Sequence, residues 1–180
     1  MLENLKEDTR RLREIKSKRF PWYVIESLLF ENGYQAVVLH RFAHWFRSRG
    51  IPVVGPLVAR ISLWLTGADI APEARLGPGL RIAHGVGLVI GNRARVGARA
   101  TLLHQVTLGA PSTRRVAEMP RIGDDVFIAA GARLIGGITV GDRVFVGANT
   151  VVTRDVPSDA KVVLAAQPEI VLRGPATEEE

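Results

Sequence analysis

The histidine at position 84 stands in the stretch RIAHGVGLVI, residues 81–90, between an alanine and a glycine. A neutral imidazole can take a proton from a hydroxyl group and pass it to a leaving group, because it titrates close to neutral pH. General acid–base chemistry is therefore one function open to His84. The alternative is a loop histidine without a chemical role, and the surrounding pattern has to decide between the two.

The sequence offers neither a cysteine nucleophile nor a recognisable serine nucleophile. It contains no cysteine, which excludes disulfides, thiolate metal sites and a cysteine nucleophile. It also lacks the G-x-S-x-G pattern of a strained serine nucleophile. If a group is transferred here, direct transfer is favoured over a covalent enzyme intermediate.

An aliphatic residue recurs at every sixth position through most of the chain after residue 69. These residues are Ile70, Leu76, Ile82, Ile90, Val96, Leu102, Leu108, Ile122, Ile128, Leu134, Val140, Val146 and Val152. A period of six fits neither a helix nor a simple sheet. It indicates a solenoid with three flat faces, 18 residues to a coil, whose stacked coils bury an aliphatic column.

His84 lies where this period is interrupted, because the interval between Ile82 and Ile90 is eight residues. This placement favours a functional histidine over a loop histidine. The repeat itself does not give the hand of the coil, and the general rule for parallel crossovers predicts a right-handed one.

The first 66 residues lack the six-residue period. Apolar spacing within 22–48 predicts two helices with Gly33 between them, and a third helix is expected over 53–65. Such helices would cap the open end of the solenoid. We therefore predict an N-terminal helical region (1–66), a β-helix domain (67–172) and a flexible tail (173–180).

Charge and composition limit the kinds of partner that the protein is expected to bind. The formal net charge is +6, and basic residues crowd positions 6–19, where we expect a solvated helix face. Aromatic residues make up only 6%, and no nucleic-acid-binding motif is present. The N-terminus lacks a signal peptide, and the apolar stretch 51–67 is too short to span a membrane. These features predict a cytoplasmic protein with at most peripheral membrane contact.

Several motifs in order resemble the hexapeptide-repeat acyltransferases, and the serine O-acetyltransferase branch in particular. They are GYQAVVLHRFAHWF (33–46), DIAPEARLGPGLRIAHGVGLVIG (69–91), LLHQVTLG (102–109), FIAAGARLIGG (127–137) and VGANTVVTRDVP (146–157). The resemblance implies a mainly β fold, a left-handed parallel β-helix after a short helical region. It also implies a homotrimer with active sites between subunits, acetyl-CoA as donor, a small-molecule hydroxyl as acceptor, and no metal.

Two residues match the catalytic pair of the family. His84 corresponds to the general base, and Asp69, fifteen residues earlier, to the carboxylate that would orient the imidazole and stabilise its cation. For Asp69 the alternative is a turn aspartate at the entry to the coil. His104 stands where the branch usually has a polar residue such as glutamine. It is either a second site residue or a side chain that fills a corner.

Four further residues match positions that contact coenzyme A in the wider family. Ala130 and Ala148 are one coil apart, and their small side chains would let the pantetheine arm pass close to the backbone. Thr153 and Arg154 match a Thr-Lys pair that meets the pantetheine and the nucleotide. The alternative is that VVTRDVP is only the last coil and its exit turn. Residues 110–121 are expected to form a loop whose arginines either meet phosphates or are solvated.

The sequence departs from the branch at positions that would hold serine. The branch has an aspartate before its catalytic histidine, where this chain has Ala83, and Arg-His where it has Glu118 and Met119. An acidic contact ahead of the helices is replaced by FPWY (20–23). A zwitterion bound without charge partners is disfavoured. A sugar or polysaccharide precursor is therefore the predicted acceptor, with serine, as in cysteine biosynthesis, as the alternative.

Two further expectations concern partners and class. The chain ends in Glu180 rather than the isoleucine that docks into cysteine synthase, so no such partner is expected. A non-catalytic or metal-binding trimeric scaffold is the alternative of another class. It would need three converging histidines, of which only His84 and His104 lie in the coil.

Overall fold

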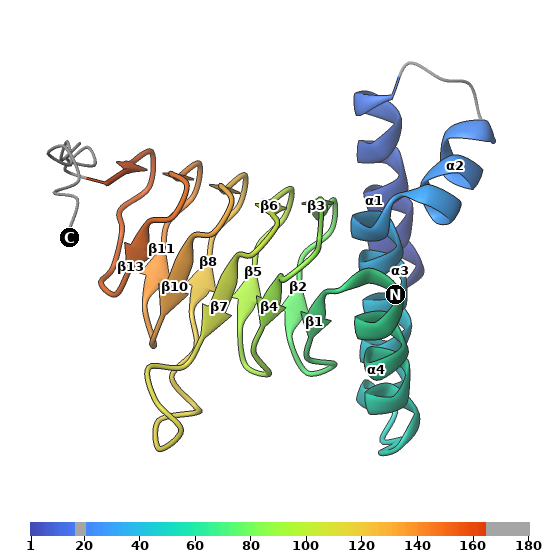
Figure 1. Cartoon of the computed structure of the whole chain (residues 1–180), viewed down its shortest axis with the longest axis horizontal. Helices are drawn as coiled ribbons and strands as arrows, with labels where there is room; N and C mark the ends of the chain where they lie inside the picture. The colour runs from blue at the N-terminus through green and yellow to red at the C-terminus, as the bar shows by residue number, and fades with distance from the viewer. Residues whose placement is uncertain (17–20, 165–180) are drawn as a thin grey trace, which may run out of the picture.

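The computed structural model describes residues 1–16 and 21–164. Within these residues four helices come first: α1 (Leu2–Ile15), α2 (Trp22–Phe30), α3 (Asn32–Ser48) and α4 (Val54–Thr66). Short strands follow: β1 (Asp69–Ile70), β2 (Arg75–Leu76), β3 (Arg81–Ala83), β4 (Val89–Ile90), β5 (Arg95–Val96), β6 (Thr101–Leu103), β7 (Thr107–Gly109), β8 (Arg121–Ile122), β9 (Phe127–Ile128), β10 (Arg133–Ile135), β11 (Thr139–Val140), β12 (Phe145–Val146), β13 (Val151–Val152) and β14 (Lys161–Val162). Figure 1 shows the strands wound into successive coils, with the helices gathered at the end where the first coil lies.

The strands form three parallel sheets that make the faces of a prism. Sheet A contains β1, β4, β7, β10 and β13, sheet B contains β2, β5, β8 and β11, and sheet C contains β3, β6, β9, β12 and β14. Neighbours in a sheet are three strands apart in the chain, except for the final pair β12 and β14. The solenoid predicted from the six-residue period is confirmed.

The core is the predicted aliphatic column. Each of its members, from Ile70 to Val152, is the second residue of a strand, and each is at most 7% exposed. A second buried column, not predicted from the sequence, lies two residues before the first. Its members are Ala68, Ala74, Leu80, Leu88, Ala94, Ala100, Val106, Val126, Ala132, Ile138 and Val144. The two columns together fill the inside of each coil and its corner.

The helices cover the first coil and share its core. Ala36 and Val37 of α3 are buried in the same apolar cluster as the solenoid residues. Helix α4 ends at Thr66, and Gly67 turns the chain into β1 with a left-handed backbone (φ 73°). Gly33 lies in the first turn of α3, so the break between helices falls at Glu31 instead. The tail predicted for 173–180 lies outside the described residues.

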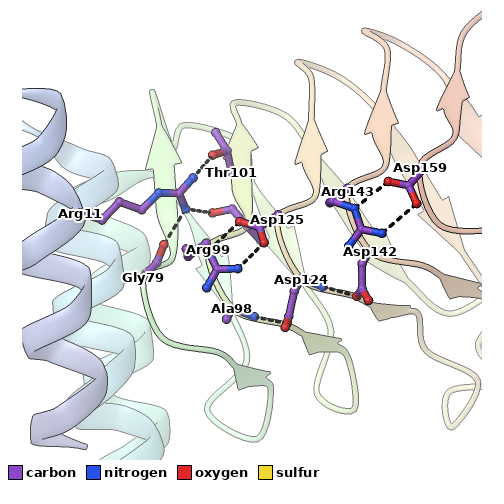
Figure 2. A network of polar contacts seen from close by, with 11 residues as sticks. Arg11, Gly79, Ala98, Arg99, Thr101, Asp124, Asp125, Asp142, Arg143 and Asp159 are labelled. Atoms are coloured by element: carbon purple, nitrogen blue, oxygen red, sulfur yellow. Dashed lines mark hydrogen bonds and ion pairs between the residues drawn. The ribbon is translucent and has the colours of Figure 1, made fainter.

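Helix α1 is docked against the prism, which corrects the expectation of a wholly solvated basic face. Arg11 donates hydrogen bonds to the carbonyl oxygens of Gly79 (2.5 Å) and Ala100 (2.7 Å) and to Oγ1 of Thr101 (2.8 Å). Figure 2 shows this guanidinium reaching from α1 to two successive coils. The carbonyl of Ala100 also accepts the backbone N–H of Arg81 at 3.0 Å, so Arg11 is a second donor to that oxygen and links α1 to both coils.

A buried ion pair fixes α1 to α3 and to the first coil. The guanidinium of Arg41 donates to both carboxylate oxygens of Asp8, at 2.9 and 3.1 Å, and both side chains are at most 5% exposed. Arg41 also donates to the carbonyls of Leu76 and Gly77, and Asp8 accepts the backbone N–H of Leu80 at 2.9 Å. Every strong polar group of the pair therefore has a partner, as burial requires.

The two histidines of α3 have structural surroundings. Nδ1 of His44 is 2.8 Å from the carbonyl oxygen of Pro72 in the first coil. The side chain of His40 is buried, and this burial lowers its pKa to about 3. Its ring is therefore neutral at physiological pH. Both residues lie at the junction between α3 and the first coil of the prism.

One edge of the prism carries a series of aspartates that join successive coils (Figure 2). Asp124 accepts the backbone N–H of Ala98 at 2.7 Å, and Asp142 accepts that of Asp124 at 2.8 Å. The exposed ion pairs Arg99–Asp125 and Arg143–Asp159 lie beside them. Because exposed pairs contribute little, the aspartate bonds to backbone are the more important links between coils.

Apolar side chains remain exposed on two helices. Trp22 and Phe30 of α2 and Trp64 and Leu65 of α4 are each between 67% and 79% exposed in the single chain. Among the described residues, none of the helices combines the length and apolar character that crossing a membrane requires.

Candidate active site

His84 stands on two extra residues inserted into the first coil. Ile82 pairs with Leu102, 20 residues later, whereas Val89 pairs with Thr107, 18 residues later. The backbone N–H of Gln105 bonds to the carbonyl of Val86. Val86 is therefore the counterpart of His104, and the extra residues are His84 and Gly85.

The insertion presents the imidazole to solvent. His84 follows directly on β3 with a left-handed backbone (φ 56°), a conformation that few residues other than glycine adopt. Its side chain is exposed, whereas Ile82 before it and Leu88 after it are buried in the core. The interrupted period thus corresponds to a widened corner that carries a histidine.

The start of α3 holds this corner in place. Oδ1 of Asn32 accepts the backbone N–H of Gly85 at 3.3 Å, and its amide donates to the carbonyl of Thr66 at 3.2 Å. Gly33 lies directly on the backbone of β3. The helical region therefore does more than cap the solenoid, because it fixes the segment that carries His84.

Gly33→Ala is expected to disturb this contact. A Cβ at residue 33 would lie 2.8 Å from the carbonyl carbon of Ile82, and its carbonyl oxygen would be closer still. We expect a loss of about 1–3 kcal/mol in the free energy of unfolding, as for other overpacked sites, measured by urea denaturation. Gly137→Ala is the matched control, since its Cβ would meet no atom within 3.5 Å. Equal stability of both variants would contradict the contact.

A pocket of about 280 Å³ opens beside His84 between α1, the start of α3 and β3. Ala83 and His84 form one side of it. Lys16 and Glu31 also line it and form an ion pair, and the hydrogen bond to Glu31 raises the pKa of Lys16. Asp8 lines the pocket too, but its carboxylate is already bound by Arg41. Spacing in the sequence gives no sign that α1 contributes to this pocket.

Asp69 lies near the widened corner without bonding to His84. It is the first residue of β1, its side chain is exposed, and its backbone N–H donates to the carbonyl of Leu88 at 2.8 Å. Within residues 1–16 and 21–164 there is no hydrogen bond between its carboxylate and the imidazole. The backbone brings Asp69 alongside the end of the inserted turn, and the catalytic pair remains a prediction.

A second imidazole faces the first. The rings of His84 and His104 have centroids 6.4 Å apart and meet nearly edge to face, at 76°. His104 occupies the same corner one coil further along, and its buried Nδ1 atom has no hydrogen-bond partner among the residues that the structure describes. No group of three histidine, aspartate or glutamate side chains that could hold a metal ion occurs in the described part of the chain.

The corner that carries the histidines also carries two of the predicted cofactor residues. The backbone N–H of Gly131 bonds to the carbonyl of His104, and that of Asn149 bonds to the carbonyl of Ala130. His104, Ala130 and Ala148 therefore stack in successive coils along one corner between sheets C and A. We call this column the C–A corner.

Thr153 and Arg154 do not lie at the C–A corner. Both are exposed and follow β13, on the corner where the chain leaves sheet A, whereas Ala148 precedes β13. The two sets of predicted cofactor residues are therefore at opposite ends of the sheet A strands. A single chain does not bring all four together.

The predicted loop projects from the prism after β7 (Figure 1). Arg121, which we expected in the loop, is instead the first residue of β8, because Ile122 resumes the buried column. Arg114 is exposed, and Arg115 forms an exposed ion pair with Glu118 at 3.2 Å. The side chain of Met119 lies against Gly91.

Known proteins match the repeat and most of the chain. A family model described as bacterial transferase hexapeptide (six repeats) matches residues 119–154. The serine acetyltransferase of Synechococcus elongatus is 44% identical over 139 residues, which are 77% of this chain and 57% of the relative. The serine acetyltransferase of Helicobacter pylori is 36% identical over 154 residues, which are 86% of this chain and 88% of the relative. The chain belongs to the serine acetyltransferase family.

Solved members of the serine acetyltransferase family share the fold. The enzyme of Neisseria gonorrhoeae in complex with serine matches with a TM-score of 0.80 at 32% identity, covering 93% of this chain and 68% of that one. The enzyme of Brucella abortus in complex with coenzyme A also gives 0.80 at 32% identity, covering 91% and 65%. The β-helix is left-handed, as the resemblance implies, and the right-handed crossover rule is wrong here.

Proposed function

We propose that the protein transfers the acetyl group of acetyl-CoA to the hydroxyl of L-serine. The observation that carries this proposal is the exposed imidazole of His84, raised on a two-residue insertion beside a pocket, in a chain of the serine acetyltransferase family. Solved relatives are named as complexes with serine and with coenzyme A, which supports both substrates.

In the reaction His84 acts as general base. As it takes the proton of the acceptor hydroxyl, the oxygen attacks the thioester carbonyl carbon, and the carbon–sulfur bond then breaks. The imidazolium returns the proton to the departing sulfur, so the imidazole is regenerated. Asp69 would accept a hydrogen bond from the other ring nitrogen once a substrate orients the imidazole, and this would stabilise the cation.

The C–A corner fits the donor. Ala130 and Ala148 present only methyl groups there, which leaves room for the pantetheine arm along the backbone towards the two histidines. Thr153 and Arg154 are assigned to the nucleotide end, on the neighbouring corner. Assembly as a homotrimer, which would bring corners of different subunits together, belongs to the same proposal.

A second acceptor class has one specific observation in its favour. Ala83, beside the proposed base, lines the pocket without a charge, and Glu31, which also lines it, is paired with Lys16. An uncharged acceptor such as a sugar hydroxyl would need no free carboxylate there. The relatives named here are serine acetyltransferases and lend the sugar no support, so serine is the acceptor we propose.

A panel of acceptors distinguishes the two. The protein is incubated with acetyl-CoA and serine, homoserine or nucleotide sugars, and free thiol is followed over time. We expect thiol release with serine, and a higher kcat/KM for serine in Ala83→Asp, because a carboxylate beside His84 would pair with the substrate ammonium. Release with a sugar alone, unchanged by that substitution, would replace serine with the second acceptor class.

A further inference from the structure

Three arginines lie next to one another on the outer surface of sheet B. Arg75, Arg95 and Arg121 are the first residues of β2, β5 and β8, and they pair directly across the sheet. All three are exposed, because the second residue of each strand is the one that fills the core. Neighbouring strands in a sheet are about 4.8 Å apart, so these cationic side chains start at short and regular intervals. We call the three residues the arginine ladder.

The arginine ladder has no counter-charge of its own. Within residues 1–16 and 21–164, none of its guanidinium groups forms a hydrogen bond or an ion pair. Elsewhere on the prism the chain does supply such partners, since Arg99 and Arg143 are each paired with an aspartate. In sheets A and C, no two neighbouring strands of the described coils begin with residues of the same charge. Because like charges opposite one another destabilise a sheet, the ladder indicates that a ligand supplies the negative charge.

The arginine ladder lines a hollow of about 570 Å³. Arg47, from the last turn of α3, and Arg93, from the turn before β5, line it as well. Among the described residues the lining has one carboxylate, that of Glu73, which is already bound by Arg47 at 2.7 Å. Arg93 and the three residues of the ladder therefore face the hollow without an acidic partner in the described part of the chain. The volume is in the range of small-molecule sites.

This hollow is separate from the proposed path of the donor on the same chain. Ala130 and Ala148 lie at the C–A corner, where sheets C and A meet. Sheet B is the third face of the prism and lies across from that corner. A donor that follows the C–A corner therefore does not reach the arginine ladder of its own chain.

We propose that the hollow on sheet B binds an oligophosphate, a small molecule with two or more phosphate groups in a row. This inference does not rest on the proposed function. A guanidinium group binds phosphate through two parallel N–H donors, and a row of phosphates can face successive arginines of the ladder. A single phosphate would leave part of the ladder without a counter-charge.

A nucleic acid fits the hollow less well than an oligophosphate. No aromatic side chain is present in the described lining, whereas single strands are usually bound by stacking on aromatic rings. The ladder crosses three strands, which is roughly 10 Å. A single-strand site covers about four nucleotides or more, so a nucleic acid would need a longer basic surface.

Calorimetric titration of the full-length protein with inorganic triphosphate tests the site. We expect binding to the wild-type protein, and a loss of about 10- to 100-fold in affinity in Arg95→Gln, because that substitution removes charge-assisted hydrogen bonds at the centre of the ladder. The side chain of Arg95 is exposed, so the variant should keep the thermal stability of the wild type. A wild-type protein that does not bind triphosphate would overturn the inference.

Arg143→Gln is the matched control. It removes the same charge from an exposed arginine that is paired with Asp159, away from the hollow. Its affinity for triphosphate should equal that of the wild type. An equal loss in Arg95→Gln and Arg143→Gln would mean that the net charge of the protein attracts the probe, and the site would be rejected.

Competing ligands define what the hollow recognises. Adenosine triphosphate should bind about as tightly as inorganic triphosphate, because the phosphate row is the part that is bound; binding of the nucleotide alone would contradict this. Saturating coenzyme A should leave the affinity for triphosphate unchanged, and displacement would show that the two sites are one. A short single-stranded DNA that binds more tightly than triphosphate, and depends on Arg95, would replace the oligophosphate with a nucleic acid. None of these measurements needs turnover, so they stand whether or not the protein acetylates serine.

Discussion

His84→Ala should lower kcat/KM for acetyl transfer about 10²- to 10⁴-fold, the range that a general base usually contributes. The substitution removes the only group proposed to take the hydroxyl proton, while the pocket and the donor corner remain. Because the imidazole is exposed and stands outside the buried columns, thermal stability should be nearly unchanged. Thiol release from acetyl-CoA, measured with the best acceptor, reports the effect.

The control for this variant lies on the same corner. Val86 is 59% exposed and two residues further along, and it has no group that can move a proton. Val86→Ala should therefore retain the wild-type rate. If His84→Ala is as active as Val86→Ala, the base assignment is wrong.

Asp8→Ala should lower the free energy of unfolding by about 3–5 kcal/mol, because it leaves the guanidinium of Arg41 buried without its counter-charge. It also removes the acceptor for the backbone N–H of Leu80, a group of the first coil. A loss of this size is a large fraction of the free energy of unfolding of an ordinary domain. Urea denaturation followed by circular dichroism measures it.

A neighbouring carboxylate supplies the comparison. Glu7 is on the same helix, and its partner Arg10 is exposed, with 3.5 Å between the charged atoms. Glu7→Ala should change stability by no more than about 1 kcal/mol, as for other surface pairs. A similar loss in both variants would mean that the buried pair does not hold α1 to the prism.

The repeat could be predicted from the sequence because it is local and strict. One aliphatic residue for each six positions specifies the faces of the prism, and the single eight-residue interval marks the place where His84 leaves it. The second buried column was missed because it mixes alanine with valine, leucine and isoleucine. The hand of the coil is not encoded in any spacing and came from likeness to known proteins.

The position of α1 could not be predicted from the sequence, because it depends on contacts between residues far apart in the chain. Its decisive contacts join residues 33 to 90 positions apart, as in Asp8 with Arg41 and Arg11 with Thr101. In the sequence Asp8 and Arg11 are charged residues in a charged helix, and such residues are usually solvated. Residues of α1 line part of the pocket beside His84, so the lining of that pocket could not be predicted from the sequence either.

The pairing of Asp69 with His84 depends on side-chain orientation in the proposed trimer, which neither spacing nor the single chain specifies. The acceptor depends on charges that come from several elements. At Ala83 the local chemistry favours a neutral acceptor, while the family as a whole favours serine.

The two-residue insertion at His84 and Gly85 has an evolutionary consequence. It adds length to one coil without shifting the register of the next, since β3 and β4 keep their pairing with β6 and β7. A short turn can therefore be added at a corner without loss of the scaffold, although the added residues are themselves constrained, since Gly85 is buried and held by Asn32. In evolution, a lineage can thus gain a reactive side chain on one coil while the repeats on either side keep their fold.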